Sequence, residues 1–202
     1  MNYKSSAPAS SKGKLLREFH DKYIVIDLET TGLSSTMNEI IEFCGIKIEN
    51  GQIIDELTIL IKPSYPVDAF ITSLTGISNE MLIDESDIES VIDEITDFLG
   101  DSILLGHNTN FDVRFLYDNL LNLRNTFFEN NYMDLLSIVR KLYPSWRNHK
   151  LDTTAFKLNT INKPAHRAKS DCMITYEAYE LCKNYIRENN IDYKSLFRYR
   201  RY

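Results

Sequence analysis

Two carboxylates follow the first strongly apolar stretch of the chain. In "YIVIDLETTGL" (residues 23–33), the apolar run 24–26 is followed at once by Asp27 and Glu29. Residues two apart in a strand point to the same face, so these two side chains project together. Carboxylates that share a partly buried face repel one another, and desolvation adds to the cost. The pattern predicts either a bound cation between them or an early end to the strand that leaves both in water.

A third acid follows a second apolar stretch, in "GHNTNFDVRFL" (residues 106–116). His107 and Asn108 close that stretch, and Asp112 comes in the first turns of the helix expected next. In α/β domains the strand ends converge on one edge, where ligands bind, so Asp112 can approach Asp27 and Glu29. An acid at a helix start that interacts with the macrodipole is the alternative, and both interpretations stay open at this point.

The third motif is "HRAKSD", in which His166 precedes the last long helix and Asp171 lies in its first turns. Five residues of helix turn through roughly 140° beyond a full circle, so the two side chains would face apart if both were helical. A His166 placed in the preceding loop can instead fold back over a site that Asp171 faces. The apolar run 172–174 predicts that this turn packs inward. A surface His followed by an ordinary helix-start acid is the alternative.

Together the three motifs offer four carboxylates and one imidazole from separate elements. Hard oxygen ligands of this kind suit Mg²⁺ or Mn²⁺ better than zinc. Four acids exceed what one Mg²⁺ usually takes from protein, and they fit two ions roughly 3.5–4 Å apart, an arrangement that serves phosphoryl transfer.

The elements that would position these side chains follow from apolar periodicity and turn residues. Alternating strands and helices predict one α/β domain around a mixed sheet. An Asn50-Gly51 turn predicts a hairpin, and the acid-rich segment 79–101 predicts an amphipathic helix with a solvated outer face. The strands are expected at 22–29, on both sides of residues 50–51, at 102–108 and near 132; the helices are expected before Gly76, within 79–101, and at 109–121, 134–143, 151–161 and 168–189.

Bulk composition indicates a globular chain in a reducing compartment. The sequence has 202 residues, of which 43% are hydrophobic and 26% charged, which is ordinary for a folded domain. It contains neither an apolar run long enough to cross a membrane nor a secretory signal. Its three cysteines (Cys44, Cys172 and Cys182) include no C-x-x-C pair, so a cytoplasmic location is expected.

The net charge of −6 is unevenly distributed along the chain. Residues 1–20 carry +3 and residues 193–202 carry +4, so the part between them carries −6 − 3 − 4 = −13. Such a body does not attract nucleic acid by its own charge, but it suits a protein that holds divalent cations. We expect a flexible basic tail over 1–20, a catalytic domain over 21–190 and a basic aromatic tail over 191–202.

The three motifs in this order resemble the DEDDh branch of the DnaQ-like 3′→5′ exonucleases. The likeness is greatest to the epsilon-type proofreading exonucleases of bacterial DNA polymerase III. It spans about residues 23–182 and includes the segment "SLTGISNEML" and the segment 133–160. Three separated motifs are far more specific than any one of them. The resemblance implies a ribonuclease H-like fold with a five-stranded mixed sheet flanked by helices.

The resemblance also implies roles for individual residues. Two Mg²⁺ or Mn²⁺ ions would be held by the four acids, and His166 would take a proton from the attacking water. The turn and pocket around the terminal nucleotide would use the other matched residues, although Gly32 is also explained as a plain turn residue. The implied metal ligands are Asp27, Glu29, Asp112 and Asp171; the implied substrate-binding residues are Thr30, Thr31, Gly32, Leu33, Asn108 and Phe111.

The resulting hypothesis is a metal-dependent 3′→5′ exonuclease acting on 3′ ends of single-stranded DNA, with a DNA polymerase or sliding clamp as a candidate partner. A 3′→5′ exoribonuclease of the oligoribonuclease or RNase T type is the nearest alternative. An inactive module that binds nucleic acid or tethers a polymerase is the alternative from another class, and it predicts loss of a ligand or of His166. The C-terminal "YKSLFRYRRY" could add stacking and charge to strand binding, or could simply be a frayed helix end.

Overall fold

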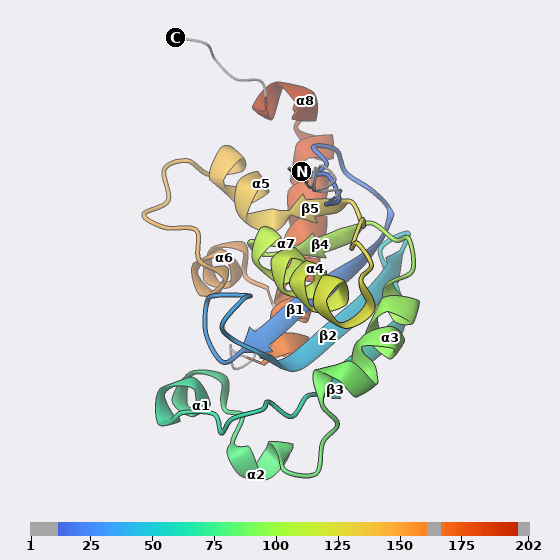
Figure 1. Cartoon of the computed structure of the whole chain (residues 1–202). Coiled ribbons are helices and arrows are strands. Elements are labelled where there is room, and N and C mark those ends of the chain that lie inside the picture. Colours follow the sequence, from blue (N-terminus) through green and yellow to red (C-terminus); the bar gives the residue numbers. More distant parts are fainter. Residues whose placement is uncertain (1–11, 161–166, 198–202) are drawn as a thin grey trace, which may run out of the picture.

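The chain folds around one mixed sheet in the computed structural model, which describes residues 12–160 and 167–197. Within those residues the sheet has five strands in the order β3-β2-β1-β4-β5 (Figure 1). The pairs β1–β2 and β2–β3 are antiparallel, whereas β1–β4 and β4–β5 are parallel. The strands are β1 (Lys22–Thr30), β2 (Ile40–Glu49), β3 (Gln52–Leu60), β4 (Leu104–Gly106) and β5 (Tyr132–Asp134).

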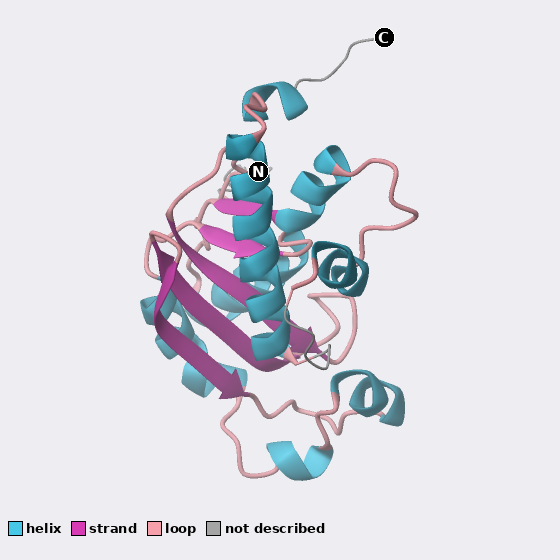
Figure 2. Ribbon diagram, turned by 180° about the vertical axis from the view of Figure 1, so that it is seen from behind, coloured by secondary structure: helices cyan, strands magenta, loops and turns pink. Residues whose placement is uncertain are grey.

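Helices cover both faces of this sheet. Figure 2 shows α7 crossing one face, and α3 and α4 lie on the other. The small helices α1 and α2 lie beyond the end of the sheet (Figure 1). The expected α/β class, a five-stranded mixed sheet flanked by helices, is therefore confirmed. The helices are α1 (Ala69–Thr75), α2 (Asn79–Leu82), α3 (Ile88–Leu99), α4 (Asn110–Arg124), α5 (Leu135–Leu142), α6 (Leu151–Leu158), α7 (Ala168–Glu188) and α8 (Tyr193–Leu196).

Strand β1 is buried on both faces, and the alternation of its side chains between the two faces determines the face on which its acids lie. Ile24 and Ile26 belong to the core under α3 and α4, while Tyr23 and Val25 belong to the core under α7. Since the side-chain period of a strand is two, the odd-numbered positions that follow Val25 point to the α7 side. Asp27 and Glu29 therefore continue the series that faces α7.

The hairpin between β2 and β3 turns at the expected residues. Asn50 and Gly51 both adopt left-handed conformations, with φ of 53° and 72°. A two-residue turn of that type requires φ > 0 at both positions, which Asn and Gly tolerate best. The predicted hairpin is confirmed, and it sets the register in which β3 pairs with β2.

The segment 79–101 is two helices rather than one. Helix α2 ends at Leu82, and α3 begins at Ile88 after Asp87, whose side chain accepts a hydrogen bond from the backbone N–H of Ser90. An aspartate that caps a new helix in this way favours a break before it. The amphipathic pattern holds within α3, where Val91, Ile92, Ile95 and Leu99 are buried.

The N-terminal segment packs on the sheet for part of its length, although residues 1–20 are expected to be a flexible tail. Leu15 pairs in parallel with Tyr132 of β5, and the backbone N–H of Leu16 donates to the carbonyl of Tyr132 at 2.7 Å. The ring of Phe19 lies 5.2 Å from that of Tyr179 on α7. Residues 1–11 lie outside the described residues, so the correction concerns residues from 12 onward.

Among the described residues, no helix combines the length and the apolar character that crossing a bilayer would require.

Candidate active site

Three carboxylates meet between the end of β1 and the start of α7. Each of Asp27, Glu29 and Asp171 offers an oxygen that lies within 4.8 Å of an oxygen from the other two. The two β1 acids face α7 because of the strand alternation, and Asp171 lies in the first turn of that helix. Asp171 is only 9% exposed. The inward packing predicted for the turn around Asp171 is confirmed.

The fourth acid, Asp112, approaches from the other side of β1. It is the third residue of α4 and is 4% exposed. Its Oδ1 accepts a hydrogen bond of 3.1 Å from the backbone N–H of Leu28, the residue between Asp27 and Glu29. The structure thus brings Asp112 to the same strand end, as the site interpretation of this residue predicted.

Crowding and burial make these acids hard to ionise while no cation is bound. Burial raises the pKa of Asp27 well above its ordinary value, and the charges of Asp112, Asp171 and Glu29 raise it further. The pKa of Glu29 rises to about 8, mainly through burial, then through Asp171 and Glu42, against the lowering effect of Arg167. Burial also raises the pKa of Asp112, although backbone N–H donors oppose the shift.

The donor set fits a hard divalent cation. All the converging ligand atoms are carboxylate oxygens, and like charges held this close require a compensating positive charge. A bound Mg²⁺ or Mn²⁺ among Asp27, Glu29 and Asp171 would supply it, with Asp112 adjacent. Perturbed carboxylates gathered at one strand edge are also typical of functional sites.

A fifth acid, Glu42, completes the cluster and was not anticipated from the sequence. Glu42 on β2 is the cross-strand partner of Glu29, and its carboxylate accepts hydrogen bonds from Arg167 and from the backbone N–H of Ala168. The signal available in the sequence was the period of "EIIEFCGIKI", which places Glu42 on one face with Cys44. Only the β1–β2 register shows that this face is the one that Asp27 and Glu29 share.

The expected nucleotide-binding turn is a compact loop between β1 and β2. The backbone N–H of Thr31 donates to the carbonyl of Glu39 at 2.9 Å, and the hydroxyl of Thr30 donates to the carbonyl of Gly32 at 2.7 Å. A Cβ on Gly32 would lie 2.7 Å from the side chain of Asn38, so only glycine fits there without a shift. The hydrogen-bonding groups of Thr30 and Thr31 therefore build the turn itself.

Leu33 extends from this turn into solvent and is 89% exposed. An apolar side chain so exposed, four residues after Glu29 in the chain, is suited to pack on a flat ring. Phe111 is half-buried, with its ring 4.9 Å from that of Phe115. Asn108 adopts a left-handed conformation (φ 74°), and its backbone N–H donates to Asp134 Oδ1 at 2.8 Å.

His166 lies outside the described residues, so its relation to the four acids is not part of the structural account. Arg167, which follows it, is the first described residue of this segment. The imidazole of His107 belongs to a different contact, because its Nε2 lies 2.9 Å from the carbonyl oxygen of His149. Burial lowers the pKa of His107.

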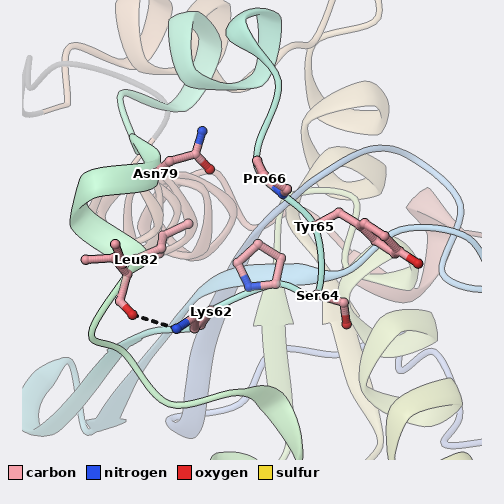
Figure 3. Close-up of a pocket in the computed structure, with 8 residues that line it drawn as sticks. Lys62, Ser64, Tyr65, Pro66, Asn79 and Leu82 are labelled. Carbon is pink, nitrogen blue, oxygen red and sulfur yellow. Dashed lines mark hydrogen bonds between the residues drawn. The ribbon is translucent and has the colours of Figure 1, made fainter.

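A pocket separate from the carboxylate cluster lies beside α2, and none of the four acids lines it (Figure 3). It has a volume of about 300 Å³ and is bordered by the segment 62–66, Asn79 and residues 82–83. The Nζ of Lys62 donates to the carbonyl of Ile83 at 2.6 Å across one side of it. The carboxylate cluster is therefore the better candidate for chemistry.

The strand order and the helices on both faces are those of the ribonuclease H-like fold, with the carboxylates gathered at the end of β1. A model of the exonuclease family (RNase_T) matches residues 24–179, and the chain belongs to this family. Its resemblance to DnaQ-like exonucleases is thereby confirmed, as is the enzyme class, a nuclease.

The relatives are much longer proteins. The DNA polymerase III PolC-type of Listeria monocytogenes is 38% identical over 172 residues, which cover 85% of this chain and 12% of the relative. The DNA polymerase III PolC-type of Bacillus subtilis is 39% identical over 173 residues, which cover 84% of this chain and 12% of the relative. The chain thus spans about an eighth of the length of these relatives.

Solved structures confirm the expected ribonuclease H-like fold. Exonuclease X, solved in complex with 5′ overhanging duplex DNA, aligns with a TM-score of 0.65 and 22% identity over 86% of this chain and 96% of that one. Escherichia coli exonuclease I, solved with a dA16 oligonucleotide, aligns with a TM-score of 0.74 and 19% identity over 88% of this chain and 43% of that one.

Proposed function

We propose that the chain is a metal-dependent 3′→5′ exonuclease that removes nucleotides from the 3′ ends of single-stranded DNA. The observation that carries this proposal is the convergence of Asp27, Glu29 and Asp171 within 4.8 Å, with Asp112 against the same strand. These four side chains would hold two Mg²⁺ or Mn²⁺ ions. The catalytic unit proposed is residues 21–190, flanked by the segments 1–20 and 191–202.

The reaction is a hydrolysis in which a water oxygen bonds to phosphorus and the bond from phosphorus to the 3′ oxygen breaks. The bound ions would neutralise phosphate charge and favour ionisation of the water. The four acids would hold those ions, and the ions would in turn place the phosphate. The proposed proton acceptor is His166, since an imidazole with an ordinary pKa near 6.5 accepts a proton readily at neutral pH.

The loop after β1 is the proposed holder of the terminal nucleotide. Its internal hydrogen bonds fix the backbone of residues 30–33, and Leu33 projects from it. Leu33 is proposed to pack on the terminal base, with Phe111 and Asn108 lining the same pocket. A preformed loop lowers the entropy cost of binding, because little has to be ordered when the strand end arrives.

The names of the relatives support DNA, and not RNA, as the proposed substrate. Two of the most similar relatives are named DNA polymerase III PolC-type, and exonuclease I was solved with a DNA oligonucleotide. A polymerase is accordingly the proposed partner for the chain. A 3′→5′ exoribonuclease stays the alternative, and sugar preference is part of the test below.

The test is digestion of 5′-labelled DNA and RNA strands of one sequence, with and without EDTA. We expect a DNA ladder that shortens from the 3′ end and disappears with EDTA. Asp27→Asn should lower the rate on the order of 100-fold or more, because it removes a charge aimed at the reacting centre. The Tm of metal-free Asp27→Asn should equal or exceed that of the parent, since repulsion is relieved.

The matched control is Asp97→Asn, which removes an exposed acid on α3 and should leave the rate unchanged. Undiminished nucleotide release by purified Asp27→Asn would refute the catalytic assignment. Faster turnover of the RNA strand than of the DNA strand would mean that the substrate is RNA and that the proposal of a DNA substrate is wrong.

A further inference from the structure

Glu42 is a buried acid whose oxygens are already occupied by protein donors. It is 1% exposed. Arg167 donates from Nε to both carboxylate oxygens at 3.2 Å and from Nη2 to Oε1 at 2.7 Å. The backbone N–H of Ala168 donates to Oε2 at 2.9 Å. A carboxylate has about four acceptor sites, so Glu42 has little capacity left to bind a metal ion.

The ion pair joins the start of α7, which carries Asp171, to β2, the strand beside the β1 acids. Glu42 lies opposite Glu29 in the β1–β2 ladder. Arg167 immediately precedes α7, and its carbonyl accepts a hydrogen bond of 3.0 Å from the backbone N–H of Asp171. A chain of neighbours therefore runs from Glu29 through Glu42 and Arg167 to Asp171, and it holds the start of α7 against β2 beside the end of β1.

Stability alone does not account for a charged pair at this place. Only the Glu42 carboxylate is buried, since the Arg167 side chain is 42% exposed, so the cost of desolvating Glu42 offsets much of what the attraction contributes to stability. A fifth carboxylate beside Glu29 also adds to the repulsion within the cluster. What the pair adds is geometry, since a guanidinium that holds a carboxylate with two nitrogen atoms fixes distance and orientation together.

We propose that Glu42 and Arg167 are positioning residues that set the distance between Asp171 and the β1 acids, and thereby the affinity for the divalent ions. This inference rests on the proposed function for its consequence in catalysis. Neither residue is assigned as a metal ligand or as a contact of the substrate. Arg167 also directly follows His166 in the chain, so the same anchor fixes the point at which that segment joins α7.

The first test is Mn²⁺ binding to the metal-free chain, measured by isothermal titration calorimetry. Arg167→Gln should weaken Mn²⁺ binding about 10-fold, the scale expected when a residue that orients metal ligands is lost. Arg167→Lys keeps the charge but loses the paired donors, so it should restore only part of the affinity. Full restoration by lysine would overturn the positioning role and leave charge alone as the cause.

A double-mutant cycle shows whether the pair acts as one unit. Glu42→Gln and Arg167→Gln should each weaken Mn²⁺ binding, and the double variant should lose little more than either single variant. Losses that simply multiply would overturn the proposal, because they would mean that each residue acts on its own.

Two control variants on α7 separate positioning from charge and from stability. Lys169→Gln removes an exposed cation, paired with Glu56 at 2.6 Å, from the same turn of the helix. Lys183→Met removes a buried cation that is 2% exposed and pairs with Asp21 and Glu180. We expect both to leave Mn²⁺ affinity unchanged, and the second to lower Tm. A loss of affinity in either control as large as that of Arg167→Gln would overturn the proposal.

Steady-state kinetics distinguish the remaining roles. We expect Arg167→Gln to lower kcat and to raise the Mn²⁺ concentration that gives half-maximal activity, with KM for the oligonucleotide nearly unchanged. A raised KM with unaltered Mn²⁺ affinity would identify a substrate contact and overturn the proposal, as would a lowered Tm with neither change. If the parent chain binds Mn²⁺ but cleaves no strand, the proposed function fails. The double-mutant cycle of Mn²⁺ binding would still test the positioning role of Glu42 and Arg167.

Discussion

At the scale of single residues, the carboxylate cluster lowers the stability of the metal-free chain, because its buried charges repel one another. Asp27, Glu29 and Asp171 face one another, and Asp112 lies against the same strand end. Arg167 is a nearby cation that lowers the pKa of Glu29. Natural proteins accept such local repulsion at functional sites, where the strain is relieved by a ligand. The metal-free protein should therefore show the repulsion as a dependence of stability on pH.

The sign of that dependence follows from the pKa shifts. Folding raises the pKa of Asp27, Asp112 and Glu29, so the folded chain binds more protons than the unfolded chain, and its stability falls as pH rises. For Glu29 the affected window runs from its ordinary 4.5 up to about 8. We predict that the Tm of the metal-free chain decreases between about pH 5 and pH 8.

Scanning calorimetry across that range checks the prediction. Saturating Mg²⁺ should flatten the slope, because the ion stabilises the ionised carboxylates, and Glu29→Gln should remove part of it. A Tm of the metal-free chain that rises over this window would contradict the assignment of a crowded, uncompensated cluster.

At the scale of elements, α7 organises the molecule from one end to the other. Its first turn carries Asp171, its middle carries Tyr179 in the core, and Lys183 further along pairs with Asp21 just before β1. The N-terminal segment packs on the same helix through Phe19, whose ring contacts Tyr179 of α7. The Phe19 ring also lies 4.2 Å from that of Tyr193, the first residue of α8. The two flanking segments thus meet on α7, away from the acids.

This packing predicts that Phe19 contributes to stability but not to chemistry. Phe19→Ala removes ring contacts with Tyr179 and Tyr193, which should cost about 1–3 kcal/mol in the free energy of unfolding. Denaturant unfolding measures the loss, and nucleotide release should stay at the parental rate. Tyr65→Ala, which removes an exposed ring, is the control and should change neither. An unaltered denaturation midpoint for Phe19→Ala would contradict this packing and support the expectation that residues 1–20 are a flexible tail.

At the scale of the whole molecule, the charge distribution governs how a strand is attracted. The part between residues 20 and 193 carries −13, obtained from −6 − 3 − 4. Such a body repels a phosphate backbone, so bound cations would have to provide the main attraction. Binding should therefore depend more on divalent ions than on monovalent salt.

We predict a shallow salt dependence for binding of a single strand in Ca²⁺, used here to suppress cleavage. The slope of log affinity against log NaCl should be about −1 to −2, which corresponds to few phosphate contacts made by Lys or Arg. Fluorescence anisotropy with a labelled oligonucleotide measures it, and EDTA should abolish the binding. A steep slope that EDTA does not affect would mean that basic segments such as 193–202 hold the strand.

Much of the architecture was accessible from the sequence because it is encoded locally. The period of two in β1 placed Asp27 and Glu29 on one side, and Asn50-Gly51 fixed the hairpin. One segment was misjudged for a local reason, since the cap at Asp87 divides 79–101 into two helices. The packing of residues near Leu15 and Phe19 was missed because it depends on partners more than a hundred positions away.

The sequence by itself determined which side chains are the candidates for chemistry, since residue type and the side-chain period of β1 are properties of short segments. Only the tertiary structure decided that Glu42 and Arg167, 125 positions apart, close on each other beside Glu29. The physical reason is that this contact depends on the β1–β2 register and on how α7 packs across the sheet. Neither the register nor the packing of α7 produces a periodic pattern in the sequence around Glu42 or Arg167.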